Sequence, residues 1–238
     1  MSTENRTTYR SVACLCPDGN TREFLVDKKH AEMDSCLDHG ALSGICGYAD
    51  EKDAWNLFNN ISKILVSIHN DGLAHGGISA EHIFLGSDNE MFLENSNIVV
   101  GKDKTGPTNN IDPSNLSPQR AACNNVVNSA DDVWSIGSVV FHLLMGVKIF
   151  NGQGGRVQRR TTPVPVFNAS VYSQDLCDLT RRCLSYEPDM RPSLDEIVQL
   201  SEAAIKKYDS KLIPRKKSTD MSISIKDVID YWPEKMEG

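Results

Sequence analysis

The order of hydrophobic and polar residues predicts a largely helical chain that begins with short strands. The clearest helix spans residues 50–71, where apolar residues recur at i, i+3, i+4 and i+7 and therefore share one buried face. Asp50 is suited to cap the start of this helix, and Gly72 stands where a left-handed residue commonly ends one. The apolar face consists of Ala54, Leu57, Phe58, Ile61, Ile64, Leu65 and Ile68.

Two pairs of short apolar runs predict β-hairpins on either side of that helix. Residues 8–27 hold "YRSVACL" and "REFLV", joined by "CPDGN", whose Pro-Asp-Gly favours a turn. After the helix, "HIFL" and "EMFLE" are separated by the turn sequence "GSDN". From Asn95 to Gln119 the chain is rich in Asn, Gly, Pro, Asp and Thr and lacks periodicity, which predicts a long exposed segment.

Residues 131–145, "DDVWSIGSVVFHLLM", are apolar on nearly all sides, so we expect a centrally buried helix that ends at Gly146. A further helix is predicted from about Ser173. The last domain helix follows a capping box formed by Ser193 and Glu196.

The C-terminal tail carries a basic patch, "PRKK" at 214–217, and then a short amphipathic pattern. A helix of about nine residues is not stable alone in water. We therefore expect it to dock either on its own domain or on a partner, and the sequence leaves both open. Its apolar positions are Ile225, Val228, Ile229 and Trp232.

Charge and composition narrow the class of protein. The chain of 238 residues has a net charge of −7 and a pI near 5.4, and it lacks the dense basic face of a nucleic-acid-binding protein. No apolar run approaches the roughly 18–20 residues of a membrane span, and "MSTENRTTYR" has no secretory h-region. The odd cysteine count favours reduced thiols in a cytoplasmic protein. Zinc binding by Cys14, Cys16, Cys36 and Cys46 is disfavoured, because their spacing matches no zinc motif.

Four stretches in one register resemble the eukaryotic-type protein kinases. "ADDVWSIGSVVFHLLMG" looks like the family's D-x-W-S-x-G stretch, and "CLSYEPDMRP" looks like its L-x-x-x-P-x-x-R-P. "LSPQ" stands where Ala-Pro-Glu closes the activation segment, and "AHGGISAEHIFL" stands where the catalytic loop would be. The resemblance covers about residues 8–208.

This resemblance implies an α+β, kinase-like fold, a mainly helical C-lobe with a small β-hairpin remnant of the N-lobe. We assign residues 1–50 to that hairpin and its connector, 51–210 to the C-lobe, and 211–238 to a basic linker and an amphipathic helix. The positions that hold the family's C-lobe together are retained, namely His75, Asp132, Trp134, Gly137 and Arg191. Gln119 replaces the glutamate that the family pairs with this arginine.

The catalytic positions implied by the resemblance are degenerate. The catalytic aspartate, loop lysine and metal-binding asparagine fall on Gly77, Ser79 and His82, and the metal-binding aspartate falls on Asn95. Glycine offers no base, and neither asparagine nor histidine replaces a carboxylate well as a Mg²⁺ ligand. Losing one oriented catalytic group costs about two to four orders of magnitude in rate, so we expect neither catalysis nor an ATP or Mg²⁺ cofactor.

Four further positions or stretches can be compared with the catalytic machinery of the family. Gly76 replaces the arginine that reads activation-segment phosphorylation, so we expect no phosphorylation switch of the usual kind. Glu94 is an off-by-one candidate for the metal-binding aspartate, although a solvent-facing strand end is the simpler interpretation. Lys28 lies too close to His75 to be the ATP-pairing lysine. "NGQGGRV" (151–157) imitates a glycine-rich loop, but it follows a helix and is expected to be a flexible loop.

The sequence therefore favours a pseudokinase, a catalytically inactive binding, scaffolding or allosteric module in signalling. Its expected partner is a protein, for example an active kinase or a phosphatase, rather than nucleic acid or a membrane. The alternative is a divergent nucleotide-using transferase with relocated chemistry on Glu94, His82 and His75. A third possibility is that another chain supplies the missing part of the N-lobe.

Overall fold

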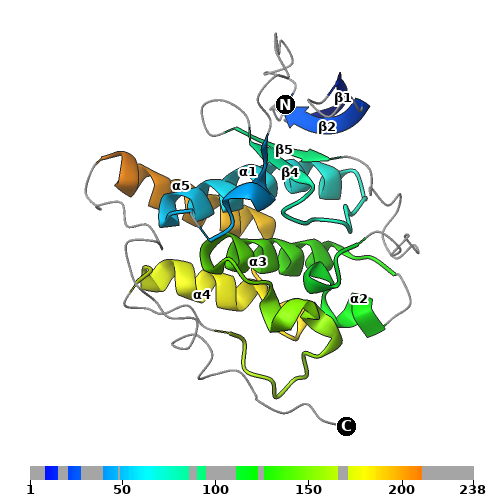
Figure 1. The fold of residues 1–238 in the computed structure, drawn as a ribbon, viewed down its shortest axis with the longest axis vertical. Helices are drawn as coiled ribbons and strands as arrows, with labels where there is room; N and C mark the ends of the chain where they lie inside the picture. The colour runs from blue at the N-terminus through cyan, green and yellow to red at the C-terminus, as the bar shows by residue number, and fades with distance from the viewer. Residues whose placement is uncertain are drawn as a thin grey trace, which may run out of the picture.

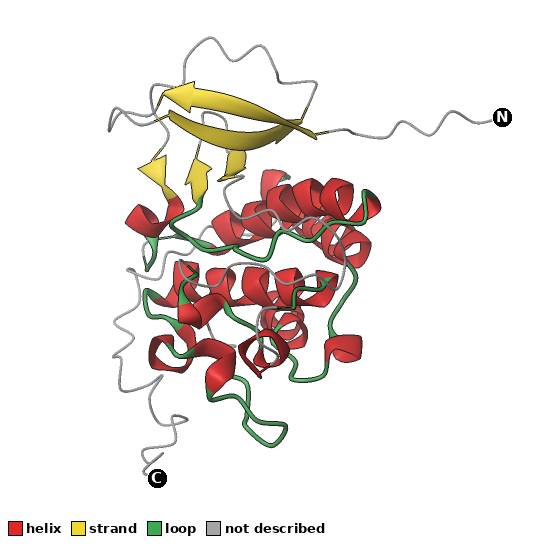
Figure 2. Ribbon diagram, turned by 90° about the vertical axis from the view of Figure 1, so that its right-hand side faces the viewer, coloured by secondary structure: helices red, strands yellow, loops and turns green. Residues whose placement is uncertain are grey.

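The computed structural model describes residues 9–15, 21–27, 40–47, 49–85, 90–94, 111–122, 126–165 and 171–210. It has an α+β architecture, as predicted, with a small sheet at one end of a larger helical body (Figures 1 and 2). Lys28, Asn95 and the tail helix at 225–232 lie outside the described residues.

The two predicted hairpins join in a single antiparallel sheet. The first consists of β1 (Tyr9–Leu15) and β2 (Thr21–Asp27), and the second of β4 (Ile83–Leu85) and β5 (Met91–Glu94). With β3 (Gly40–Ala41), the strand order is β1-β2-β5-β4-β3. Strand β2 pairs with β5 and places Leu25 opposite Leu93, so the sheet connects segments on both sides of the boundary assigned at 50/51.

Helix α1 (Glu51–Asn70) matches the predicted 50–71 helix because its signals are local. The Asp50 side chain accepts from the Asp53 backbone N–H, and the Asp53 side chain accepts from the Asp50 N–H in return. The predicted apolar face is buried. After the helix, Gly72 has φ +74, the left-handed conformation that glycine adopts at no steric cost.

Helix α3 (Ser129–Met145) is the buried centre of the helical body, as its all-round apolar pattern predicted. Asn128 caps its start, and Gly146 ends it with φ +68. Helix α4 (Gln174–Cys183) packs against α3, and α5 (Leu194–Asp209) lies along α1 (Figure 1). At the second interface, the Asn59 amide donates to the Ser201 hydroxyl at 3.1 Å in a buried position.

The capping box predicted before α5 forms only in part. Ser193 accepts from the Glu196 backbone N–H, as predicted. The Glu196 carboxylate instead receives two hydrogen bonds from the Arg182 guanidinium, at 2.6 and 2.8 Å. This carboxylate therefore joins α4 to α5, which the local motif did not predict.

One short α-helix and several 3-10 helices complete the body: α2 (Pro118–Ala122), η2 (Leu42–Ile45), η4 (Pro113–Asn115), η5 (Ile149–Gly152), η6 (Gly154–Arg156) and η7 (Pro188–Met190). The prediction of a flexible loop at 151–157 is wrong for the two adjacent glycines in this stretch. Gly154 and Gly155 are buried against the backbone of residues 113–118, and a Cβ on either would overlap that backbone. These glycines therefore serve close packing.

The cysteines with described side chains are free thiols, namely Cys46, Cys177 and Cys183. Burial raises the pKa of Cys46 to about 11 and that of Cys183 to about 12, so both stay protonated at neutral pH. Within the described ranges there is no group of side chains arranged to hold a metal ion, and no helix long and apolar enough to cross a membrane.

Candidate functional site

The candidate site is the loop of residues 75–82, which connects α1 to β4 and is anchored by one buried carboxylate. Asp132, near the start of α3, is fully buried. Its Oδ1 accepts from the Gly76 N–H at 2.7 Å, and its Oδ2 accepts from the His75 N–H at 2.9 Å. The Nε2 of His69, at the end of α1, lies 2.8 Å from the same Oδ2. The loop, α1 and α3 thus meet at a single side chain.

The charge on Asp132 is stabilised despite its burial. Desolvation alone would raise its pKa, but the hydrogen bond and charge of His69, with the backbone donors, hold the pKa below its ordinary value. A carboxylate in this state accepts hydrogen bonds more strongly than a neutral group does. Asp132 therefore fixes the backbone of the loop.

His75 is enclosed and uncharged. Its Nε2 donates to the Glu94 carbonyl at 2.8 Å, while its Nδ1 accepts from the Gly77 N–H at 3.3 Å. Burial lowers the pKa of the imidazole below its ordinary value, although the Asp132 charge opposes this shift. The ring therefore connects the loop to the end of β5 and is not poised to exchange protons near pH 7.

Two contacts join the positions predicted to be degenerate to one another. His82 Nδ1 lies 3.0 Å from the Gly77 carbonyl oxygen, and its backbone N–H donates to the Ser79 carbonyl at 3.1 Å. Ser79 is buried. The Glu94 carboxylate lies 3.8 Å from His82 Nε2, and both side chains are partly exposed. The structure thus brings together Gly77, Ser79, His82 and Glu94, while Asn95 lies outside the described residues.

The retained family positions hold the helical body together. Trp134 is fully buried and donates to Gln158 at 3.0 Å. Gly137 lets α4 approach α3, because a Cβ there would come within 2.8 Å of Cys183 Cβ. Arg191 donates to the Gln119 Oε1 at 2.5 Å, so the neutral side chain keeps the contact that a glutamate would make. Burial lowers the pKa of Arg191 to about 10, and it remains charged.

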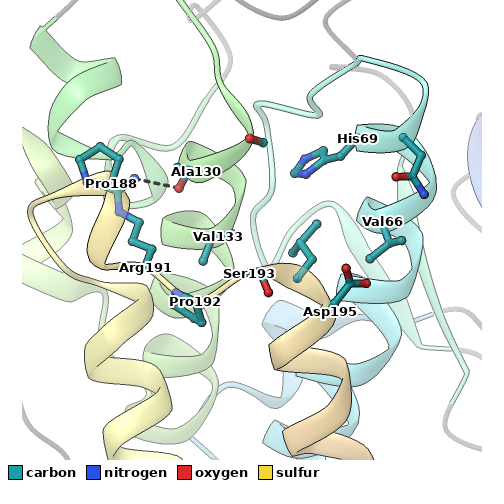
Figure 3. Close-up of a pocket in the computed structure, with 12 residues that line it drawn as sticks. Val66, His69, Ala130, Val133, Pro188, Arg191, Pro192, Ser193 and Asp195 are labelled. Carbon is teal, nitrogen blue, oxygen red and sulfur yellow. Dashed lines mark hydrogen bonds between the residues drawn. The ribbon is translucent and has the colours of Figure 1, made fainter.

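A pocket of about 340 Å³ lies where α1, α3 and the start of α5 meet (Figure 3). His69 and Val66 of α1 face it from one side, and Arg191 and Pro192 lie on the other. Arg191 is fixed by a hydrogen bond of 2.8 Å to the Ala130 carbonyl. Because His69 also contacts Asp132, the pocket and the 75–82 loop share one hydrogen-bonded group.

Sequence reasoning missed Arg120, which lies in α2 at the end of the long segment after β5. Its Nη1 donates to the Gly76 carbonyl, and the side chain is buried. The contact joins residues separated by 44 positions, and no local pattern predicts such a pair.

Comparison with known proteins gives the family context. Residues 29–201 match the protein kinase domain family. The serine/threonine-protein kinase Nek9 of Mus musculus is 27% identical over 167 residues, which are 64% of this chain and 16% of Nek9. CBL-interacting protein kinase 22 of Oryza sativa subsp. japonica is 27% identical over 161 residues, 63% of this chain and 36% of that kinase. NUAK family SNF1-like kinase 2 of Rattus norvegicus is 24% identical over 150 residues, 62% and 24% respectively. The chain therefore spans less than half the length of each of these relatives.

Proposed function

The chain belongs to the protein kinase domain family, and from this membership we propose that it is a catalytically inactive member that acts as a protein-binding, scaffolding or allosteric module. The observation that carries the proposal is the 75–82 loop. Its anchor, Asp132, is in place and fully bonded. The positions that would act on a phosphoryl group carry Gly77, Ser79 and His82 instead.

The chemistry of these three positions supports the proposal. Phosphoryl transfer depends on positioned charge and on a group that orients the attacking hydroxyl. Gly77 has no side chain, and its carbonyl and N–H are used within the loop. Ser79 is neutral and buried, and the Nδ1 of His82 is directed at Gly77 rather than at an open site. The loop therefore offers structure without the charges of catalysis.

Nucleotide binding gives the first test. If the chain does not bind nucleotide, millimolar ATP with Mg²⁺ should change the melting temperature by less than about 1 °C. A ligand that does bind, at a hundred times its Kd, would add about 2.7 kcal/mol of stability and would shift a domain of this size by several degrees. An active protein kinase measured in parallel serves as the positive control. A shift of several degrees in this chain would contradict the proposed lack of a nucleotide cofactor, and its absence in Glu94→Gln would place the binding site at Glu94.

A second candidate function is favoured by one juxtaposition. The Glu94 carboxylate faces the His82 imidazole at 3.8 Å, and both side chains reach solvent. A carboxylate and an imidazole so placed can bind a cation-bridged phosphate or accept a proton. The relatives are named as kinases, which also favours an enzyme. In this alternative the chain is a divergent transferase, and the thermal-shift titration separates it from the inactive module.

We also propose that the tail supplies the contact to a protein partner in the cytoplasm, such as an active kinase or a phosphatase. Its positions Ile225, Val228, Ile229 and Trp232 would form the apolar face of a helix laid in a partner's groove. A chain ending at Ser210 should then melt within about 2 °C of the full chain, since the lobe loses no packing. Affinity purification with mass spectrometry should lose the partner in Trp232→Ala. A truncated chain that melts many degrees lower would show that the tail packs on its own lobe.

A further inference from the structure

Gly76 occupies a place in the loop where no side chain fits. Its φ is +69, in the left-handed region that favours glycine. A Cβ built on Gly76 would overlap the Arg120 Nη1 and lie 3.0 Å from the Val127 Cγ1. The volume next to this backbone position is therefore already filled by an arginine, and that arginine comes from another element.

Arg120 is held by hydrogen bonds from both its backbone and its side chain. Its backbone N–H donates to the Ser117 hydroxyl at 3.1 Å, and that hydroxyl donates to Asp131. Its Nη1 donates to the Gly76 carbonyl. The side chain is only 4% exposed, which leaves no path for it to act as an exposed anion receptor. Arg120 thus connects the start of α2 to the loop.

The charge of the guanidinium is balanced within the protein. Burial lowers the pKa of Arg120, and the charges of Asp132 and Asp131 oppose that shift. Both aspartates lie in the first turn of α3. Among the described residues, Arg120 Nε and Nη2 have no hydrogen-bond partner, so these two carboxylates stabilise the charge through space rather than by direct bonds.

We propose that Arg120 is a positioning residue that locks the 75–82 loop to the end of the long segment after β5 without any phosphate. In the family that the chain resembles, an arginine at position 76 reads phosphorylation of that segment. In this chain, position 76 is a glycine, and the arginine reaches the same backbone from position 120. The link is therefore constitutive. It is independent of the proposed loss of catalysis, because an active protein could carry the same link.

The first test measures exchange of single backbone amides in the full chain by NMR. In Arg120→Ala we expect the amides of residues 75–77 to exchange at least tenfold faster than in the wild type. Arg191→Ala is the matched control, since Arg191 is also buried near the start of α3 but bonds to residues 119, 130, 185 and 186 instead. It should lower the melting temperature without selective exposure of residues 75–77. Unchanged exchange at 75–77 in Arg120→Ala, or equal effects of both variants there, would overturn the proposal.

The second test uses the wild-type protein and does not depend on a variant that folds. Amide exchange at residues 75–77 is compared before and after phosphatase treatment, with removal of phosphate checked by mass spectrometry. A constitutive link predicts rates within twofold of each other. Exchange that becomes tenfold faster after treatment would show that a phosphate holds the loop, and would overturn the proposal.

The third test uses two glycines with similar backbone conformations. Gly72 has φ +74 and no atom within 4 Å of a built Cβ, so Gly72→Ala measures the backbone cost alone. We expect Gly76→Ala to lower the melting temperature by several degrees more than Gly72→Ala. In an Arg120→Met background, which keeps an apolar stem but removes the guanidinium, this difference should shrink by at least half. A difference that is absent in the wild type, or unchanged by Arg120→Met, would show that Arg120 does not fill this place.

Discussion

At the scale of single residues, the loop is held by groups whose protonation is fixed by burial. His75 donates from Nε2 and accepts at Nδ1, so its two bonds need the neutral ring. Asp132 makes the opposite demand, because its bonds need the charged carboxylate. At neutral pH the His75 ring is neutral and the Asp132 carboxylate is charged, and protonation in acid would break the hydrogen bonds of both groups.

This arrangement predicts the direction of a pH effect. The folded-state pKa of His75 is below its unfolded value, so its contribution is fully present above about pH 6.5 and is lost as the pH falls toward the folded pKa. The free energy of unfolding in urea should therefore decrease in that window, by at most about 1.4 kcal/mol per pH unit for this one proton. His142 contributes in the same direction.

His75→Gln is the variant that checks this assignment. It should be less stable than the wild type at pH 7.5 and should show a shallower loss of stability below pH 6.5. The groups around the ring, Asp132, His82 and Arg120, are unchanged in the variant, so the difference in slope belongs to His75. An identical slope in both proteins would refute the assignment.

At the scale of elements, the close approach of α3 and α4 rests on Gly137. A Cβ at this position would lie 2.8 Å from Cys183 Cβ and 3.1 Å from Leu184 Cγ. Gly137→Ala should gain about 1 kcal/mol of helix propensity and still lower stability by about 1–3 kcal/mol, because overpacking outweighs the gain.

Gly44→Ala is the control for that substitution, measured by the same urea unfolding. Gly44 is exposed, and a Cβ there would meet no atom within 4 Å. Its stability should change by less than about 0.5 kcal/mol. If Gly137→Ala proved as stable as this control, the packing role of Gly137 would be wrong.

Elements with local signals were predictable, and contacts between distant segments were not. The apolar patterns of α1 and α3, the Asp50 cap and Gly146 are local in the sequence, so both helices were predicted, although α3 begins at Ser129, two residues before the expected start at 131. The pairing of β2 with β5 depends on two segments on either side of α1, and nothing in either strand specifies it. The burial of Gly154 and Gly155 likewise depends on residues 113–118, which are distant in sequence.

The candidate site was also predictable only in part. The anchor Asp132 and the degenerate positions of the loop could be found because a known motif fixes their spacing. The contacts around these positions could not be predicted, since they require the β5 carbonyl of Glu94 beside His75 and the Arg120 guanidinium beside Gly76. The retained Asp132, and the substitutions Gly77, Ser79 and His82 at the family's catalytic positions, were visible in the sequence.

At the scale of the whole molecule, the chain combines a kinase-family body with a loop that is bonded to α3, to α2 and to the end of β5. Helix α3 joins the loop through Asp132, the α4 surface through Gly137, and the 185–191 turn through the Ala130 carbonyl. These contacts preserve the shape of the lobe.

The central claim is that this lobe does not transfer phosphate. The direct measurement is the incorporation of label from radiolabelled ATP, in the presence of Mg²⁺, into the chain itself and into a general acceptor protein. Incorporation should not exceed that of heat-denatured protein. Gly77→Asp should remain equally inactive, because Ser79, His82 and Asn95 are unchanged in it. Clear incorporation by the wild type that disappears in Glu94→Gln would contradict the account.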